Sequence, residues 1–356
     1  MHFTYEKVKR YNVIRKIIFT ISLAFLIAAT TGQSYAHEAE LVTAVRPDPE
    51  GTPTKVYIGI YLTDLSNINS VKQTFAPNFI MIAHWKDPHL ASKSNEKEGT
   101  YRHMSLNEIW NPRFHVMNQQ WLHRLFSQKD VVWVSPDGEV VYMQQFYGDL
   151  TMPMHFKNFP FDKQTMPITI VSGGFGPKSV EFIVDSKRTG RNDVFSIADW
   201  EVGEVKGASG TYYVKGHDRE FSQIEFTLPA RRHAGFFVSR VIMPLILIVI
   251  MSFTVFWIDP KDIGPQLGIA ATSMLTIIAF QFAVNNSLPR IFYLTRIDLF
   301  ILFSTTIVFL VLIESITTST LARRGNAKLA LAIDMWAKWI FPPCFILLGI
   351  YTLLIY

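Results

Sequence analysis

The sequence has one cysteine, Cys344, among its 356 residues, so no disulfide can form within a single chain. It also lacks a large charge of one sign. The formal net charge is +5, but the first 36 residues hold five basic groups and one acidic group, which leaves about +1 (5 − 5 + 1) on the remainder. The composition therefore argues against a nucleic-acid partner, and noncovalent packing has to hold any exported domain together.

Common catalytic motifs are absent as well. The chain has no Gly-x-Ser-x-Gly element and no His-Glu-x-x-His zinc pair. The glycines of "SGGFGP" (172–177) lack the spacing of a phosphate-binding loop and indicate a turn. These absences argue against a hydrolase on a membrane anchor, so we predict a protein that is not an enzyme and that needs no cofactor or metal.

Long apolar runs are present instead. Apolar residues make up 49% of the chain and aromatic residues 14%, which is high for a soluble protein. The segments 263–289, 299–313 and 339–356 contain no charged residue, and 236–258 contains only Arg240. Each can cross about 30 Å of hydrocarbon once flanking residues are included. We therefore predict a transmembrane domain at 233–356, with helices at about 236–258, 264–287, 297–321 and 334–356.

The N-terminus has the pattern of a secretory signal peptide at residues 1–36. Basic residues precede an apolar core at 17–29, and small residues stand just before His37. The core is shorter than the about 20 residues that span a bilayer, which favours cleavage after Ala36 over an uncleaved anchor helix.

An exported N-terminal domain followed by four spans places the C-terminus on the outer side as well. The predicted loop between the third and fourth spans holds Arg323, Arg324 and Lys328, as the positive-inside rule requires for a cytoplasmic loop. Arg290 and Arg296 on the outer side make this signal modest.

Residues 37–232 have the pattern of an extracellular β-sandwich. Apolar residues alternate in "VYIGIYL" (56–62) and "FIMIAHW" (79–85), the two-residue period of strands with one buried face. "VVWV" and "VVYMQQF" flank the turn "SPDGE" (135–139), which predicts a hairpin. Further strands are predicted at 166–171, 180–185, 199–205 and 221–228, and a short helix at 66–75.

The second span differs from the others because it carries Gln266, Thr272, Ser273, Thr276, Gln281, Asn285 and Asn286. Polar side chains are unfavourable in lipid, so at least one face of this helix must meet water or protein. Helical spacing places Gly268, Thr272, Leu275, Ala279 and Phe282 on one stripe. If several copies encircle an axis, the stripe would line a pore in which Leu275 and Phe282 form constrictions that close by dewetting. Ordinary helix packing is the alternative that spacing leaves open.

The loop "MPMHFKNFPFDKQTM" (152–166) lies between two predicted strands. Its prolines and phenylalanines make it too apolar for water and too interrupted for a helix or a strand. It is therefore expected to press against another apolar surface.

Together these features resemble one family, the prokaryotic pentameric ligand-gated ion channels, which are relatives of the Cys-loop neurotransmitter receptors. The resemblance covers nearly everything after residue 54. Thirteen residues separate Met152 from Met166, which stand where animal members have cysteines, and the sequence Phe-Pro-Phe-Asp at 159–162 is similar to the loop's core. Further similar pieces are "HWKDPHL", "EIWNPRF", "VSPDGEV" and Arg232 with the phenylalanines that follow it, and 274–290 looks most like the bacterial amine-gated member.

The resemblance implies a homopentamer in a bacterial inner membrane, in contact with lipid, that conducts ions through a pore lined by the second span. It also implies a coupling site at the outer ends of the membrane helices. Asp162 is expected to pair with Arg232, an exposed and weak pair being the alternative. The stretch "LSNINS" (65–70) offers no carboxylate as a third charged partner. The implied coupling residues are Phe159, Pro160, Phe161, Asp162, Arg232 and Pro289.

An agonist site between subunits is also implied, in a cage of aromatic rings. The rings that match by position are Trp110, Phe175, Tyr212, Tyr213 and Phe221, and the choice between the two tyrosines stays open. Such rings attract an ammonium group, which favours an amine agonist. For any single ring, core packing is the alternative.

Asp262 is predicted to lie at the inner mouth of the pore. Five copies of this carboxylate would favour cations, whereas five helix N-termini alone would favour anions, and we expect cations. Two alternatives remain: a proton-gated channel of the same fold, since many histidines lie in the exported domain, and a membrane-anchored sensor that does not conduct.

Overall fold

A computed structural model describes residues 45–48, 50–92, 101–125, 130–216, 218–285 and 291–355. The predicted signal peptide, Asn286 and Pro289 lie outside the described residues. The strands are β1 (Thr54–Asn69), β2 (Thr74–Lys86), β3 (Arg102–Ser105), β4 (Phe114–Val116), β5 (Gln119–Arg124), β6 (Val131–Val134), β7 (Glu139–Thr151), β8 (Lys163–Ser172), β9 (Val180–Val184), β10 (Gly190–Arg191), β11 (Trp200–Val202), β12 (Lys206–Val214) and β13 (Arg219–Arg232).

In the part of the chain that the structure describes, the helices come after these strands except for two single turns, η1 (Pro88–Leu90) and η2 (Leu106–Glu108). The first membrane helix is built from four consecutive pieces, because its backbone passes through π-helical and 3-10 geometry at its two ends. In chain order the elements are α2 (Gly235–Phe237), η3 (Val238–Ile242), α3 (Met243–Phe253), η4 (Thr254–Trp257), α4 (Ile263–Val284), α5 (Arg296–Arg323), α6 (Ala327–Ile350) and η6 (Tyr351–Ile355).

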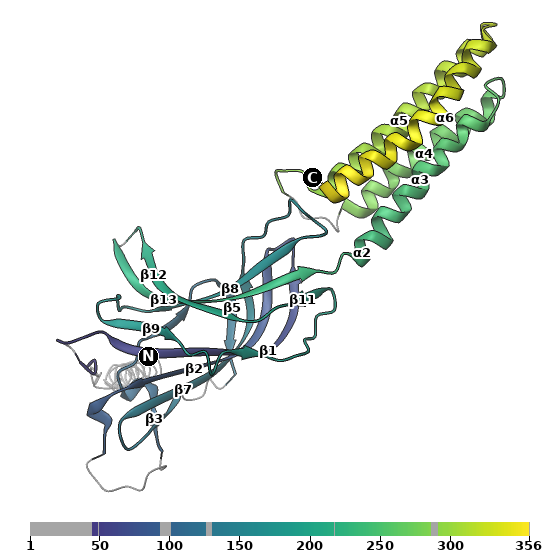
Figure 1. The fold of residues 1–356 in the computed structure, drawn as a ribbon. Coiled ribbons are helices and arrows are strands. Elements are labelled where there is room, and N and C mark those ends of the chain that lie inside the picture. Colours follow the sequence, from purple (N-terminus) through teal and green to yellow (C-terminus); the bar gives the residue numbers. More distant parts are fainter. Residues whose placement is uncertain are drawn as a thin grey trace, which may run out of the picture. The chain divides into compact units, whose positions relative to one another are not determined.

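Among the described residues the strands form two sheets. The larger has eight strands, with β10, β1, β2, β7, β6 and β3 in spatial order, β9 beside β1 and β5 beside β7. The smaller has five, with β11, β13, β8 and β4 in order and β12 paired with β13 as a long hairpin (Figure 1). Rings from both sheets meet in the core: Phe114 of β4 stacks on Tyr142 of β7 with ring centroids 5.8 Å apart. The predicted β-sandwich is thus confirmed.

The alternation read from the sequence matches the burial along the strands. In β7 every second side chain from Val140 to Leu150 is buried, and in β13 the same holds from Ser222 to Ala230. Fully burying one such aliphatic or aromatic side chain contributes about 1.5–3 kcal/mol, so this core can hold the domain without a disulfide.

The predicted helix at 66–75 was wrong. Those residues form the end of β1, a turn and the start of β2, because pairing with the neighbouring strand outweighs a weak local helical pattern. The sequence also missed β12, whose glycines and lack of alternation hide a strand that its pairing with β13 creates.

Within the described residues, four helices are long and apolar enough to cross a membrane, at Gly235–Trp257, Ile263–Val284, Arg296–Arg323 and Ala327–Leu353. Figure 1 shows α3 to α6 running side by side as one bundle. The last helix begins at Ala327 rather than at 334, and α5 extends to Arg296 at one end and Arg323 at the other. The predicted bounds left out these arginines and Lys328, but a helix continues through charged residues because its backbone hydrogen bonds do not depend on apolar side chains.

Candidate functional site

A buried ion pair joins the loop after β7 to the last residue of β13. Arg232 donates two hydrogen bonds to Asp162, Nε to Oδ1 at 2.7 Å and Nη2 to Oδ2 at 3.2 Å. The two side chains are 5% and 1% exposed. The arrangement is bidentate, so it fixes the orientation of both groups, and the weak exposed pair that the sequence left open is not what the structure contains.

The pair has further partners that satisfy its remaining polar atoms. Gln164 donates from Nε2 to Oδ2 of Asp162 at 2.6 Å, and Nη2 of Arg232 donates to the Ser70 hydroxyl at 2.9 Å. Ser70 belongs to the stretch 65–70, so a hydroxyl stands where the sequence offered no third charge. The Trp200 ring covers the guanidinium at 4.1 Å, a cation–π distance.

The loop that carries Asp162 contacts the start of the membrane helices. The carbonyl of Phe159 accepts a hydrogen bond from Ile297 N at 3.3 Å, and the Tyr293 hydroxyl accepts one from Phe156 N at 3.0 Å. The Phe159 ring also lies edge-on to Phe237 of α2, with centroids 4.7 Å apart. The Phe159–Pro160 peptide bond is cis. The apolar loop therefore presses on the ends of two helices.

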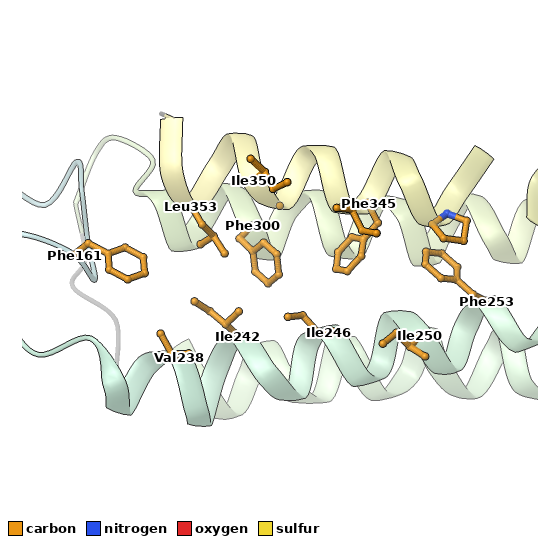
Figure 2. A pocket seen from close by; sticks show the side chains of 13 residues that line it. Phe161, Val238, Ile242, Ile246, Ile250, Phe253, Phe300, Phe345, Ile350 and Leu353 are labelled. Atoms are coloured by element: carbon orange, nitrogen blue, oxygen red, sulfur yellow. The ribbon is translucent and has the colours of Figure 1, made fainter. Parts of the chain in front are cut away.

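Phe161 points in a different direction, into an apolar cavity among the helices. Figure 2 shows its ring at one end of the space that α3 borders on one side and α5 and α6 on the other. The cavity has a volume of about 520 Å³. Of its described lining residues, Phe161 alone comes from the extracellular domain; Ile242, Phe300 and Phe345 are among the others. The ring thus links the loop to the interior of the bundle.

The predicted stripe on α4 forms one continuous exposed face. Gly268, Thr272, Leu275, Ala279 and Phe282 are all exposed. Two of them are large apolar side chains, Leu275 at 69% and Phe282 at 76% exposure. An apolar face of this size on a single chain calls for a covering, either lipid or further copies of the chain.

The opposite face of α4 packs on the rest of the bundle, and it carries three of the seven polar residues that the sequence singled out, Gln266, Ser273 and Gln281. Gln266 is fully buried, accepts from Ser319 of α5 at 2.7 Å and approaches Thr318. Gln281 donates a hydrogen bond to the hydroxyl of Thr305, which is also in α5. Ser273 is also buried. Hydrogen bonding between helices therefore accounts for Gln266 and Gln281, and close packing accounts for Ser273, whose buried hydroxyl has no hydrogen-bond partner in the described residues. The exposed stripe needs a separate explanation.

Asp262 lies immediately before α4 as its N-cap residue. Its side chain is exposed and makes no capping hydrogen bond, while its carbonyl accepts from Gln266 N at 3.3 Å. The free carboxylate is therefore available at the end of the helix that carries the exposed stripe.

The aromatic residues predicted for an agonist site divide into two groups. Tyr212 and Phe221 are cross-strand partners on one face of the β12–β13 hairpin. With His115 and Arg219 they line a hollow of about 400 Å³ over β4 and β8. None of the residues that line this hollow is an aspartate or a glutamate.

The other three rings lie differently. Trp110 is 4% exposed and packs in the core, with its ring 5.6 Å from that of the half-buried Phe175. The carbonyl of Phe175 accepts from Ser222 N at 3.3 Å, which places it next to Phe221. Tyr213 alternates with Tyr212 and donates its hydroxyl to Asp218 at 2.7 Å, a hydrogen bond that raises the pKa of the tyrosine. The structure therefore places Tyr212, not Tyr213, on the hollow.

Comparison with known proteins explains why these features occur together. Residues 38–234 match the family model of the neurotransmitter-gated ion-channel ligand binding domain, and residues 241–330 match that of the neurotransmitter-gated ion-channel transmembrane region. The chain belongs to the neurotransmitter-gated ion-channel family. Members of this family are pentameric ligand-gated channels and not enzymes, so this chain is a multi-pass membrane channel protein.

Relatives of this channel include a bacterial proton-gated channel and animal receptor subunits. A proton-gated ion channel of Gloeobacter violaceus is 26% identical over 303 residues, which cover 84% of this chain and 82% of the relative. The human gamma-aminobutyric acid receptor subunit rho-3 is 26% identical over 279 residues, 76% of this chain but 59% of that subunit. The bovine gamma-aminobutyric acid receptor subunit alpha-2 is 25% identical, with 80% of this chain and 64% of the subunit covered.

Sequence reasoning missed several residues of the channel's buried cluster. Ser70, Gln164 and Trp200 complete the surroundings of Asp162 and Arg232, yet they are common residue types with no motif of their own. Gln164 could have been found, because it stands two residues after the aspartate, at the start of β8. The other two come from distant parts of the chain, and only the fold brings them together.

Proposed function

We propose that five copies of this chain assemble around α4, and that a small agonist bound between extracellular domains opens a cation-conducting pore. The observation that carries this proposal is the contrast between the two faces of α4. One face is buried against α5, while Gly268, Thr272, Leu275, Ala279 and Phe282 are exposed together. A symmetric ring of subunits would cover such a face around an axis, where Thr272 contacts ions and the larger side chains constrict the pore.

Gating in this proposal passes through the buried cluster. Agonist binding moves the β12–β13 hairpin, and β13 ends in Arg232, which holds Asp162 and the loop on the helix ends. The same loop bonds to the first residues of α5. Motion of this contact, and of the segment around Pro289, would tilt the helices that form the constrictions. Such coupling requires an agonist that binds the open state better than the closed one.

The proposed topology places residues 37–232 outside the cytoplasm and 233–356 in a bacterial inner membrane, after removal of residues 1–36. Arg323 at the end of α5 and Arg324 beside it support a cytoplasmic α5–α6 turn. With this orientation the C-terminus lies outside the cytoplasm, together with the β-sandwich.

An agonist with an ammonium group fits the aromatic rings beside the hollow. Tyr212, Phe221 and Phe175 offer ring faces that attract a cation. The hollow also contains Arg219, whose guanidinium would hold a carboxylate. Two of the relatives are named for gamma-aminobutyric acid, a molecule that carries both groups. An amine, with or without a carboxylate, is therefore the proposed class of agonist.

Replacing Tyr212 with alanine is expected to raise the agonist concentration for half-maximal current by about 3- to 30-fold, because one cation–π contact contributes about 0.5–2 kcal/mol. Tyr213→Ala is the matched control, since its ring lies on the other face of the hairpin and bonds to Asp218. Dose–response curves for both variants measure this concentration. An equal shift for both, or a larger one for Tyr213→Ala, would contradict the assignment.

Cation selectivity is expected to depend on Asp262. In a sodium chloride gradient the native channel should reverse near the sodium equilibrium potential, and Asp262→Lys should move the reversal potential toward that of chloride. The control is Asp259→Asn, which removes an exposed carboxylate three residues earlier that bonds to Lys261 N. A native reversal potential at the chloride value would reject the proposed selectivity.

A proton-gated channel of the same fold is the second candidate, and the relative from Gloeobacter violaceus carries that name. A single experiment separates the candidates: current recording from the purified protein in planar bilayers, first during a screen of amines at constant pH and then during acidification without amine. Current that appears with an amine supports the first candidate, and current that appears with acid supports the second. A folded pentamer that stays silent under both conditions would indicate a sensor that does not conduct.

A further inference from the structure

A histidine on β2 bridges two carboxylates that belong to other parts of the extracellular domain. Nδ1 of His84 lies 3.2 Å from Oε1 of Glu139, and Nε2 lies 3.2 Å from Oδ2 of Asp185. Glu139 begins β7, and Asp185 directly follows β9. The histidine and Asp185 side chains are 19% and 12% exposed. The Tyr57 ring of β1 stacks on the imidazole at 5.0 Å.

This geometry fits a protonated ring. A neutral imidazole has one N–H, so it could donate to only one of the two carboxylates and would turn a lone pair toward the other. The imidazolium donates from both nitrogens and forms two charge-assisted hydrogen bonds. The arrangement is therefore complete only while His84 carries its second proton.

Further charged groups lie around the bridge. Arg188 donates to Oδ2 of Asp185 at 3.2 Å, and Lys86, which is paired with Glu139 across the sheet, bonds to Asp137. Burial works to raise the pKa of Asp185, but the Lys187 N–H, His84 and Arg188 more than offset it and lower the pKa. A lowered carboxyl pKa gives stability that is lost only when the pH falls through that value, so Asp185 stays ionised between pH 5 and 8.

The bridge ties residues 185–199, a segment that contains the short strand β10, to β2 and β7 of the larger sheet. The segment already lies along β1: β10 pairs with it, and Asp185 N and Asn192 N donate to the carbonyls of Ile58 and Leu62 at 2.8 and 2.9 Å. The segment lies so close to β1 that a Cβ at Gly59 would come within 2.8 Å of the Arg188 backbone. Further along, Ser196 N donates to Oδ1 of Asp64 at 2.7 Å. Among the contacts described for this segment, the one through His84 connects it to β2 and β7.

The far end of the same segment reaches the buried ion pair. Residue 199 accepts a hydrogen bond from His233 N at 2.9 Å, and the next residue is Trp200, whose ring covers Arg232. Trp200 also begins β11 and lies opposite Arg232 in the pairing of β11 with β13, so the segment fastened at Asp185 adds to a contact that the smaller sheet already makes.

We infer that His84, Glu139 and Asp185 form a proton-binding site, and that a proton bound there fastens the segment 185–199 to the sheet and so restrains Trp200 over Arg232. The ligand of this site is the proton. Its release as the pH rises removes one hydrogen bond, leaves two carboxylates facing one neutral ring, and loosens the segment.

Amide hydrogen exchange of the purified pentamer tests the site without requiring current. Protection factors, which are corrected for the intrinsic effect of pH, should be about tenfold larger over 185–199 at pH 5.5 than at pH 7.5, because one charge-assisted hydrogen bond is lost. In His84→Gln the protection should be low at both pH values. Glu139→Gln, which keeps the histidine and changes little in shape, should also reduce the difference.

The matched control is His103→Gln on β3, because His103 is exposed, contacts Trp133 and pairs with no carboxylate in the described residues. It should behave as the native protein. Equal protection of the native segment at both pH values, or a pH difference that persists in His84→Gln, would overturn the site. The link to gating rests on the proposed function and has a separate readout, the pH dependence of agonist-evoked current in native and His84→Gln channels. An unchanged dependence would overturn that link while the exchange data still decide the site.

Discussion

Channels with Arg232→Gln are expected to lose agonist-evoked current and to unfold at a lower temperature than the native pentamer. The substitution leaves the carboxylate of Asp162, which is 1% exposed, with Gln164 as its remaining side-chain donor. Breaking a buried pair from one side costs about 3–5 kcal/mol, because the remaining charge stays buried without its partner. Thermal unfolding of the solubilised protein and current recording measure the two effects separately.

The neighbouring residue supplies the control for this prediction. Arg231 precedes it on β13 and is exposed, so Arg231→Gln should change neither property. The double variant Asp162→Asn with Arg232→Gln should recover part of the lost stability, since it removes both charges together. A single variant as stable and as active as the native channel would show that the pair contributes little, and additive losses in the double variant would contradict direct coupling.

Channels with Leu275→Ser are expected to open at an agonist concentration lower by about tenfold or more, and to pass current without agonist. In the proposed pore, five leucine side chains form one constriction that excludes water from the closed state. Five serines would let water remain there, which lowers the stability of the closed state relative to the open state. A tenfold shift corresponds to about 1.4 kcal/mol for the whole ring. Dose–response curves and the current at zero agonist provide the measurement.

Leu310→Ser on α5 is the matched control, because Leu310 is also an exposed leucine of a membrane helix but does not belong to the α4 stripe. It should leave gating near the native value. If the Leu310 variant eased opening as much as the Leu275 variant, or if neither did so, α4 would not be the lining helix.

Most strands could be predicted, because a strand with one buried face alternates apolar and polar residues along the sequence. The hairpin at 135–139 is an example: β6 and β7 pair across it, and Gly138 adopts the positive φ of 81° that its turn requires. β12 could not be predicted in this way, because its existence depends on β13 and not on its own pattern. The start of α6 was predicted too late, because charged residues indicate where a span leaves the membrane and not where the helix itself begins.

The candidate site was predicted unevenly. The loop at 159–162 and Arg232 could be found because they carry a recognisable pattern, and the structure brings Asp162 and Arg232 together. Tyr212 could not be distinguished from Tyr213, because the facing of a strand residue depends on register with β13. Trp110 could not be assigned to a surface, because an aromatic residue in a loop has the same appearance in sequence whether it is packed or exposed.

The sequence by itself determined the two-part architecture, the apolar spans and which residues share the stripe of α4, because the period and the composition of a segment reflect whether each face meets lipid, water or protein. The exposure of that stripe became clear only from the structure. Only the tertiary structure decided that Gln266 and Ser273 serve helix packing, that Ser70 and Trp200 surround Arg232, and that His84 lies between Glu139 and Asp185. Such contacts join residues far apart in the chain, and their geometry depends on packing and register, which no local pattern records.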